Sequence, residues 1–294
     1  MKARKKSDIG LEQYFTPQSV ADRLAESMIQ IVGEEAAMTQ RWLEPSAGAG
    51  AFIEALVKHG VPLDHIDAFD LEPRHPHIQQ ADFLEIASTL TGPYLTIGNP
   101  PYGHRSELAV RFFNTCAARS LYVGFITPRN WRGPTLPRRL HPKFHSIYDA
   151  AVSAVFQDAD GEDSMAVRSC FQVWKASEQR RVDPDCEDRM YWITRQEEAD
   201  LILSRFSLLP MERRISKQDI GLVDIHPLVL TALEESRRLI LLCDSHYSSS
   251  VGGPTKDLIL ATLNQWFDEH PEEKAIVHAA IEAKKRKSLF DDLP

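Results

Sequence analysis

The first half of the sequence alternates short apolar runs with stretches whose apolar residues recur at helical spacing, and this alternation restricts the fold more than any other feature. Runs at 41–44, 65–70, 94–98 and 121–127 indicate strands, and helices are expected between and before them, the first over residues 17–32. Such βα units bring strands together in parallel. The sequence therefore predicts an α/β domain with a doubly wound sheet.

Two longer apolar runs, 146–156 and 166–174, follow with no helix between them. They are joined by a short acidic segment, residues 157–163, which favours an antiparallel hairpin that closes the sheet. We expect this main domain to occupy residues 1–175. A chain of 294 residues, 43% of them hydrophobic, can build one such core and a smaller module.

The smaller module is expected at residues 189–294, after a polar segment that carries Pro184. Its pattern is mainly helical. Helices are predicted at 195–206, 227–241, 256–267 and 272–285. Target recognition, formation of a homodimer and binding of a partner protein are the roles left open for it.

Composition limits the classes of protein to consider. No apolar run approaches the roughly 18 residues of a membrane span, and the N-terminus lacks the apolar region of a signal peptide, so a soluble, cytoplasmic protein with no membrane partner is expected. The cysteines are widely spaced and form no CxxC pair, which predicts reduced thiols and no metal site. The four are Cys116, Cys170, Cys186 and Cys243.

Charge is unevenly distributed along the chain. The net charge of -8 argues against binding to nucleic acid by bulk attraction, yet no acidic residue lies between Glu107 and Asp149. Contacts to nucleic-acid phosphates are predicted for five cations of this stretch, Arg129, Arg132, Arg138, Arg139 and Lys143. The alternative is a solvated face that is balanced by acids elsewhere.

The first predicted strand ends at Glu44 and runs into a turn of small residues, 45–50, which would let a ligand approach the backbone closely. A site for a dinucleotide would favour GxGxxG without an acid before it, so Glu44 points to a cationic ligand. S-adenosylmethionine carries such a cation in its amino group. Asp70 follows at the distance expected of a ribose ligand, and Asp82-Phe83 could meet an adenine through a hydrogen bond and a ring stack.

The stretch Asn99-Pro100-Pro101-Tyr102 predicts the chemistry. The amide of Asn99 and the carbonyl of Pro100 can together accept both hydrogens of an NH2 group, which concentrates the nitrogen lone pair for attack on a methyl sulfonium. Tyr102 offers an aromatic face to a base that has left its stack. A rigid turn between strand and helix is the structural alternative, but such a turn does not require asparagine.

These motifs, together with Tyr14-Phe15-Thr16-Pro17, resemble the gamma-class N6-adenine DNA methyltransferases in order and spacing. The resemblance covers about the first 175 residues and implies a Rossmann-like class I methyltransferase sheet of seven strands. It also implies a cofactor site for S-adenosylmethionine, which carried over falls on Thr16, Glu44, Ala47, Gly48, Gly50, Asp70, Asp82 and Phe83. An aromatic residue that stacks on the target adenine opposite Tyr102 would be Phe156, which could equally be a core residue at the end of its strand.

The sequence departs from this family in its second module, which is net acidic and shows no basic surface for reading DNA. An adenine methyltransferase that acts on RNA therefore remains the main alternative to one that acts on DNA. A protein-glutamine methyltransferase and a non-catalytic binding scaffold are ranked lower. The C-terminal Ser288-Leu289-Phe290 is only faintly similar to peptides that bind a sliding clamp, and a frayed tail is the preferred interpretation.

Overall fold

The computed structural model describes residues 15–157, 163–187, 189, 201–204, 207–210, 220–222, 226–236 and 256–291; within 153–168, 201–222 and 284–291 only the backbone of these is described. The chain forms two units. Unit 1 consists of the residues up to Arg129 together with Arg139–Arg181. Unit 2 consists of Asn130–Arg138 together with the residues from Val182 onward.

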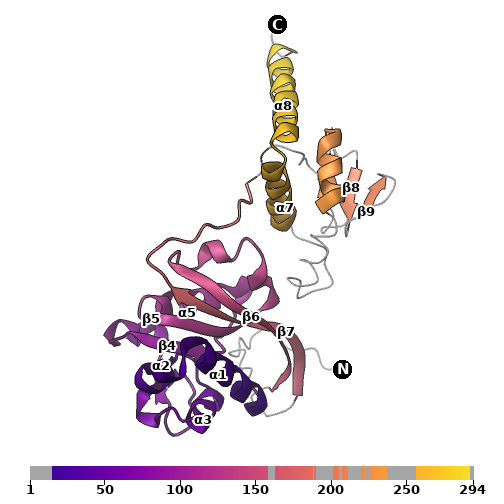
Figure 1. Ribbon diagram of the computed structural model, residues 1–294. Helices are drawn as coiled ribbons and strands as arrows, with labels where there is room; N and C mark the ends of the chain where they lie inside the picture. Colours follow the sequence, from indigo (N-terminus) through magenta and orange to yellow (C-terminus); the bar gives the residue numbers. More distant parts are fainter. Residues whose placement is uncertain are drawn as a thin grey trace, which may run out of the picture. The chain divides into compact units, whose positions relative to one another are not determined.

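Unit 1 is built on a seven-stranded sheet with the order β3-β2-β1-β4-β5-β7-β6 (Figure 1). The strands are β1 (Arg41–Glu44), β2 (Ile66–Asp70), β3 (Gln79–Gln80), β4 (Tyr94–Gly98), β5 (Ser120–Pro128), β6 (Phe144–Gln157) and β7 (Asp163–Ala176). The first five pair in parallel, whereas β7 pairs antiparallel with both β5 and β6. This confirms the predicted Rossmann-like class I methyltransferase sheet with a closing antiparallel hairpin.

Helices connect the strands of unit 1, as the sequence pattern predicts. They are α1 (Gln18–Val32), α2 (Glu34–Thr39), α3 (Ala51–Lys58), α4 (Phe83–Ile86) and α5 (Glu107–Ala117), with single 3-10 turns at Leu63–His65, Ala87–Thr89 and His104–Ser106. Two further 3-10 turns, Arg129–Arg132 and Pro137–Arg139, fall mostly within residues 130–138 of unit 2. The helix expected over 17–32 corresponds to α1, which begins at Gln18; Pro17 is its N-cap residue, and the Pro17 carbonyl accepts hydrogen bonds from the N–H groups of Val20 and Ala21.

The sheet buries side chains on both faces. One core cluster joins α1 and α3 to alternate residues of the central strands, for example Leu95 and Ile97 of β4. On α5, the ring of Phe113 meets the ring of Trp174 edge to face, with 5.7 Å between centroids. Helices that pack on a parallel sheet leave its carboxyl edge to the connecting loops, which is where the candidate site lies.

Unit 2 combines helices with a small sheet. Its helices lie at residues 227–236, at α7 (Lys256–Glu269) and at α8 (Pro271–Asp291) (Figure 1). They share a buried apolar cluster that includes Leu263, Phe267 and Val277. Its strands are β8 (Leu201–Ser204), β9 (Ser207–Pro210) and β10 (Ile220–Leu222), which pair antiparallel.

The helix predicted over 195–206 is wrong for residues 201–204, which form β8. A short apolar run such as Leu201-Ile202-Leu203 cannot be assigned to helix or strand by periodicity alone, and here pairing with β9 and β10 decides the outcome. Residues 195–200 lie outside the described part of the chain. The helices expected at 256–267 and 272–285 correspond to α7 and α8.

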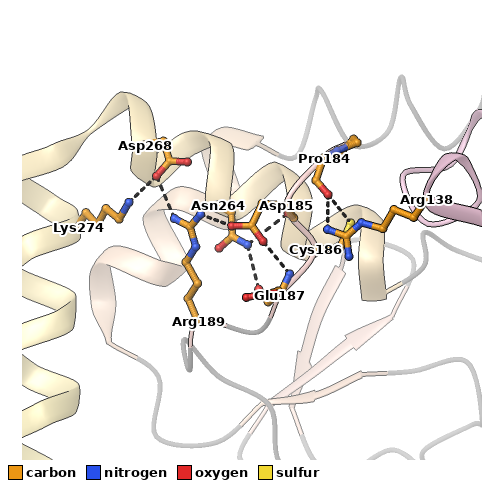
Figure 2. Close-up of polar contacts among 9 residues, drawn as sticks. All are labelled: Arg138, Pro184, Asp185, Cys186, Glu187, Arg189, Asn264, Asp268 and Lys274. Carbon is orange, nitrogen blue, oxygen red and sulfur yellow. Dashed lines mark hydrogen bonds and ion pairs between the residues drawn. The ribbon is translucent and has the colours of Figure 1, made fainter. Parts of the chain in front are cut away.

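A polar network fastens residues 184–187 and Arg189 to α7 within unit 2 (Figure 2). Arg189 pairs with both Asp185 and Asp268, and the amide of Asn264 donates to the carbonyl of Glu187 at 2.9 Å. Residues 130–138 are tied to the same unit, because Arg138 donates to the carbonyl of Pro184 and Thr135 donates to Asp257 at 2.7 Å. A segment that directly follows β5 in the sequence thus packs with the C-terminal module.

No helix in the described part of the chain is both long enough and apolar enough to span a membrane. The described residues also contain no group of three or more histidine, cysteine, aspartate or glutamate side chains that could hold a metal ion.

Candidate active site

The candidate site lies at the carboxyl edge of the sheet, where the parallel strands β1, β2 and β4 end. Glu44 closes β1 and Gly98 closes β4, and the two strands are neighbours. A Cβ atom built on Gly98 would lie 3.9 Å from Cγ of Glu44. The sheet therefore brings the acid predicted to bind a cofactor next to the residue that precedes Asn99.

The carboxyl group of Glu44 is buried, and one of its oxygen atoms lacks a hydrogen bond to the described residues. The residue is 2% exposed, and its Oε2 atom has no hydrogen-bond partner among the described residues. Burial raises its pKa well above the ordinary value of 4.5, and the nearby negative charge of Asp70 acts in the same direction. A buried carboxylate without a partner is costly, so this position is suited to a cationic ligand group.

The loop between β1 and α3 is shaped for close approach to its backbone. Gly48 and Gly50 have φ angles of 52° and 83°, in the left-handed region that side chains disfavour. A Cβ atom at Gly50 would lie 2.7 Å from Cγ of His75, and one at Gly48 would lie 3.0 Å from the ring of Phe15. Side chains from two other segments therefore close around this loop and leave no room for larger residues in it.

Asp70, the predicted ribose ligand, also holds this loop. Its Oδ2 atom accepts a hydrogen bond from the backbone N–H of Gly48 at 2.7 Å, and its Oδ1 atom accepts one from the N–H of Glu72 at 2.9 Å. The N–H of Ala47 donates to the carbonyl of Phe69 at 2.9 Å, which adds a second link between the loop and β2. The carboxylate of Asp70 thus organises the backbone from which any ligand would be bound.

Two residues that the sequence analysis did not assign, Phe15 and Arg74, flank the same loop. The guanidinium of Arg74 lies 4.7 Å from the centre of the Phe15 ring, and the N–H of Arg74 donates to the carbonyl of Gly48 at 3.0 Å. Phe15 directly precedes Thr16, so the motif that includes Thr16 could have indicated it. Arg74 has no comparable signal in the sequence.

Asp82 and Phe83 occupy the start of α4. The Asp82 side chain accepts a hydrogen bond from the N–H of Leu84 at 2.9 Å and so caps the helix. Phe83 is 2% exposed, and the centre of its ring lies 6.5 Å from that of Phe69 and 5.6 Å from that of Phe112. The structure therefore gives both residues a role in packing, and their contact with an adenine stays a prediction.

The side chain of Asn99 is held between two hydroxyl groups. Its Nδ2 atom donates to Oγ1 of Thr16 at 3.3 Å, and its Oδ1 atom accepts from the hydroxyl of Tyr102 at 3.3 Å. The hydroxyl of Ser46 donates to the backbone carbonyl of Asn99 at 3.3 Å. Thr16, Asn99 and Tyr102 are thus brought together as predicted residues of one site, and Ser46 joins them although the sequence analysis gave it no role.

Tyr102 is a neutral donor in this arrangement. Burial raises the pKa of its hydroxyl far above the ordinary value of 10.0. The phenol therefore keeps its proton throughout the usual working range of pH. Its hydrogen bond to Asn99 needs that proton.

The segment after Tyr102 is strained. Arg105 and Ser106 have φ angles of 51° and 58°, which residues other than glycine rarely adopt. The guanidinium of Arg139 donates to the carbonyl of Arg105 at 3.1 Å, and the N–H of Ala109 donates to the carbonyl of Tyr102 at 3.4 Å. The backbone behind the Asn99 loop is therefore held in place by α5 and by a residue of the basic stretch.

The structure divides the five predicted phosphate contacts between the two units. Arg129, Arg139 and Lys143 belong to unit 1, whereas Arg132 and Arg138 belong to unit 2. Lys143 lies 3.5 Å from a fully exposed carboxylate, that of Glu178, and Arg132 is 9% exposed. Arg138 and Arg139 donate to backbone carbonyls, which do not neutralise their charges. The phosphate contacts of all five residues stay predictions.

Two predictions fall where side chains are not described. Phe156 lies in β6, at a register shift between Val155 and Gln157, and its ring lies outside the described part of the chain. Ser288-Leu289-Phe290 lies in the backbone of α8, which places the segment in a helix.

Comparison with known proteins finds distant structural likenesses. No protein-family model matches the chain, and no curated protein matches its sequence. Similar solved structures include a proposed RNA methyltransferase from Pyrococcus horikoshii, with 13% identity and a TM-score of 0.45 over 60% of this chain and 94% of that one.

Two further solved structures show a similar degree of likeness. A proposed class I S-adenosylmethionine-dependent methyltransferase from Listeria monocytogenes has 14% identity and a TM-score of 0.43 over 61% of this chain and 66% of that one. The modification subunit of a proposed type I restriction enzyme from Vibrio vulnificus has 14% identity and a TM-score of 0.40 over 58% of this chain and 46% of that one. These likenesses concern the fold alone and assign neither cofactor nor substrate to this chain.

Proposed function

We propose that this chain is an S-adenosylmethionine-dependent methyltransferase that methylates the N6 amine of adenine in DNA. One observation carries the proposal. The buried Oε2 atom of Glu44, which has no partner among the described residues, lies on the strand next to the loop that carries the amide of Asn99. A site for a cationic ligand thus adjoins an amide that can bind an NH2 group.

The residues of the site fit the proposed cofactor. The carboxylate of Glu44 would pair with its amino group, and the turn of small residues after β1, which Asp70 orders, would lie against its methionine part. Asp70 is placed to bind ribose hydroxyls through the carboxylate that also orders this loop. When bound, the cofactor supplies a methyl group that is activated by its sulfonium charge.

The chain's own contribution to the reaction is to bind and orient the amine. In the proposed mechanism, Oδ1 of Asn99 and the carbonyl of Pro100 accept the two hydrogens of the adenine amine, which directs its lone pair toward the methyl group. Tyr102 stacks on the base after the base has left the helix. The new bond would form between this nitrogen and the methyl carbon while the bond from that carbon to the sulfonium sulfur breaks and leaves its electron pair on sulfur, and the amine would then release one proton to solvent.

A nucleic acid is preferred to a protein as the substrate because of the stretch between Glu107 and Asp149, which contains seven lysines and arginines and no acid. This stretch begins immediately after the Asn99 loop in the sequence. Its cations would contact phosphates on either side of the extruded base. DNA is preferred to RNA because the motifs of the site resemble those of DNA methyltransferases.

The test is methyl transfer from cofactor with a labelled methyl group to separate pools of DNA, RNA and protein, followed by nucleoside analysis. The proposal expects label in N6-methyldeoxyadenosine from the DNA pool. Label in N6-methyladenosine from RNA alone would identify RNA, and not DNA, as the substrate. Label in glutamine side chains of the protein pool would identify a protein substrate. A folded protein that binds the cofactor and labels none of the pools would contradict the proposed activity.

A further inference from the structure

The side-chain amide of Asn99 has an oxygen, Oδ1, and a nitrogen, Nδ2. The proposed reaction requires Oδ1 to face the target amine. Only the oxygen, Oδ1, can accept a hydrogen from the target amine, whereas the Nδ2 end can only donate. A rotation of the amide by half a turn would present two donors to an amine that itself donates. The orientation of this amide is therefore a condition of the proposed chemistry.

Two hydroxyl groups surround this amide, and their chemistry differs. Tyr102 is a phenol and Thr16 is an aliphatic alcohol, so the phenol is the better donor of the two and the alcohol the better acceptor. The observed pairing agrees with this difference, because Tyr102 donates to Oδ1 and Thr16 accepts from Nδ2, each at 3.3 Å. A rotated amide would pair each hydroxyl with its less suited partner.

The position of Thr16 is fixed independently of Asn99. Pro17 follows it and restricts its backbone to extended conformations. The carbonyl of Pro17 accepts hydrogen bonds from the N–H groups of Val20 and Ala21 at 2.9 Å and 3.0 Å, and the amide of Gln18 donates to the carbonyl of Ala51 at 3.1 Å. The first turn of α1 is thus anchored to α3.

We propose that Thr16 is a positioning residue that sets the orientation of the Asn99 amide: its hydroxyl holds the Nδ2 end, so that Oδ1 is turned toward Tyr102, where the target amine binds. This inference rests on the proposed function and extends it, because Thr16 was expected from the sequence only as a residue of the cofactor site. It assigns the hydroxyl of Thr16 to the methyl-transfer step.

The experiment compares Thr16→Val, which keeps the shape and removes the hydroxyl, with Thr16→Ser, which keeps the hydroxyl. Thr39→Val on α2 is the matched control, because Thr39 is exposed and its hydroxyl donates only to the carbonyl of Glu35 within its own helix. Single-turnover methylation of DNA is measured with saturating cofactor and DNA. Calorimetry gives the dissociation constant of the cofactor for each variant.

Thr16→Val is expected to slow the single turnover roughly fivefold, the effect of about one net hydrogen bond on the reactive orientation. Its cofactor dissociation constant should stay within about twofold of the wild-type value, a change worth less than one such hydrogen bond. Thr16→Ser should recover most of the rate, and Thr39→Val should match the wild type. If Thr16→Val lowers the melting temperature more than the control does, Thr16→Ala takes its place in the comparison with Thr16→Ser.

Three results would overturn the inference while leaving the proposed function intact. The first is a wild-type rate in Thr16→Val at saturating cofactor, and the second is an equal loss of rate in Thr16→Ser. The third is a loss that disappears when the cofactor concentration is raised, which would make Thr16 a cofactor contact. A wild-type chain that transfers no methyl group to nucleic acid would overturn the proposed function, and the inference with it.

Discussion

Replacing Glu44 by glutamine should stabilise the cofactor-free protein and weaken cofactor binding at the same time. Glu44 is 2% exposed, and its Oε2 atom has no hydrogen-bond partner among the described residues. Leaving a buried polar group without a partner costs about 1–3 kcal/mol, and more when the group is charged. An amide of the same shape stays buried but cannot ionise, and each unit by which burial raises the pKa of Glu44 costs the folded state about 1.4 kcal/mol once the pH is above that pKa. We therefore expect the free energy of unfolding near pH 8 to rise by about 1–3 kcal/mol.

The gain should depend on pH in a defined direction. Burial raises the pKa of Glu44 in the folded protein above its ordinary value of 4.5, so the folded state keeps a proton that the unfolded state releases. The stability contributed by protonated Glu44 is complete below about pH 4.5 and is lost as the pH rises toward the folded-state pKa. Glutamine has no such proton. The difference between Glu44→Gln and wild type should therefore be small near pH 4.5 and grow as the pH rises.

The effect on binding should have the opposite sign. A charge-assisted hydrogen bond to the amino group of the cofactor contributes about 1.5–3 kcal/mol, so its loss should raise the dissociation constant roughly 10- to 150-fold. Thermal unfolding without cofactor, measured from about pH 4.5 to pH 8, gives the first quantity, with about 2–4 °C expected per kcal/mol. Calorimetric titration with the cofactor gives the second.

Glu26→Gln is the matched control, because Glu26 is exposed on α1 and its replacement should change stability by no more than about 0.5 kcal/mol. Our account of Glu44 would be refuted by a Glu44→Gln variant that is less stable than wild type near pH 8. It would also be refuted by unchanged cofactor affinity. The first result would mean that the carboxylate is satisfied in the cofactor-free protein, and the second would mean that it does not pair with the amino group of the cofactor.

Three other substitutions test the site. Asp70→Ala should weaken cofactor binding and also lower the free energy of unfolding by about 1–3 kcal/mol, because two backbone N–H groups lose their acceptor; calorimetry and thermal unfolding check this. Gly50→Ala should destabilise the protein by about 1–2 kcal/mol in thermal unfolding, because its φ of 83° is left-handed and the new Cβ would lie 2.7 Å from His75. The pair Arg138→Gln and Arg139→Gln should reduce the slope of log affinity for DNA against log salt by about 2, and an unchanged slope would exclude both as phosphate contacts.

Much of unit 1 could be predicted because its local patterns and its topology agree. The apolar runs at 41–44 and 94–98 coincide with β1 and β4, and the acidic turn after Gln157 correctly indicated a hairpin. In unit 2, the apolar run of β8 is too short for periodicity to separate strand from helix. The attachment of residues 130–138 to unit 2 depends on hydrogen bonds such as that of Thr135 to Asp257, 122 residues apart, which leave no pattern in the sequence.

The sequence predicted which residues form the candidate site better than it predicted the hydrogen bonds between them. Asn99, Glu44 and Asp70 stand at strand ends, so a topology with parallel strands brings them to one edge. The hydrogen bonds of Asn99 to Thr16 and of Ser46 to Asn99 span 83 and 53 residues and depend on how the loops pack. The buried position of Phe83 likewise follows from its two aromatic neighbours, which the sequence does not place.

The central claim is that the Asn99 amide is needed to orient the adenine amine for methyl transfer and is not needed to bind the cofactor. The most direct test measures N6-methyldeoxyadenosine by nucleoside mass spectrometry after wild-type protein and Asn99→Ala have each been incubated with DNA and S-adenosylmethionine. Our account predicts product with the wild type and none with Asn99→Ala, while the two bind the cofactor with affinities that agree within about threefold, less than the loss of a net hydrogen bond. Product formed by Asn99→Ala at the wild-type rate would contradict it.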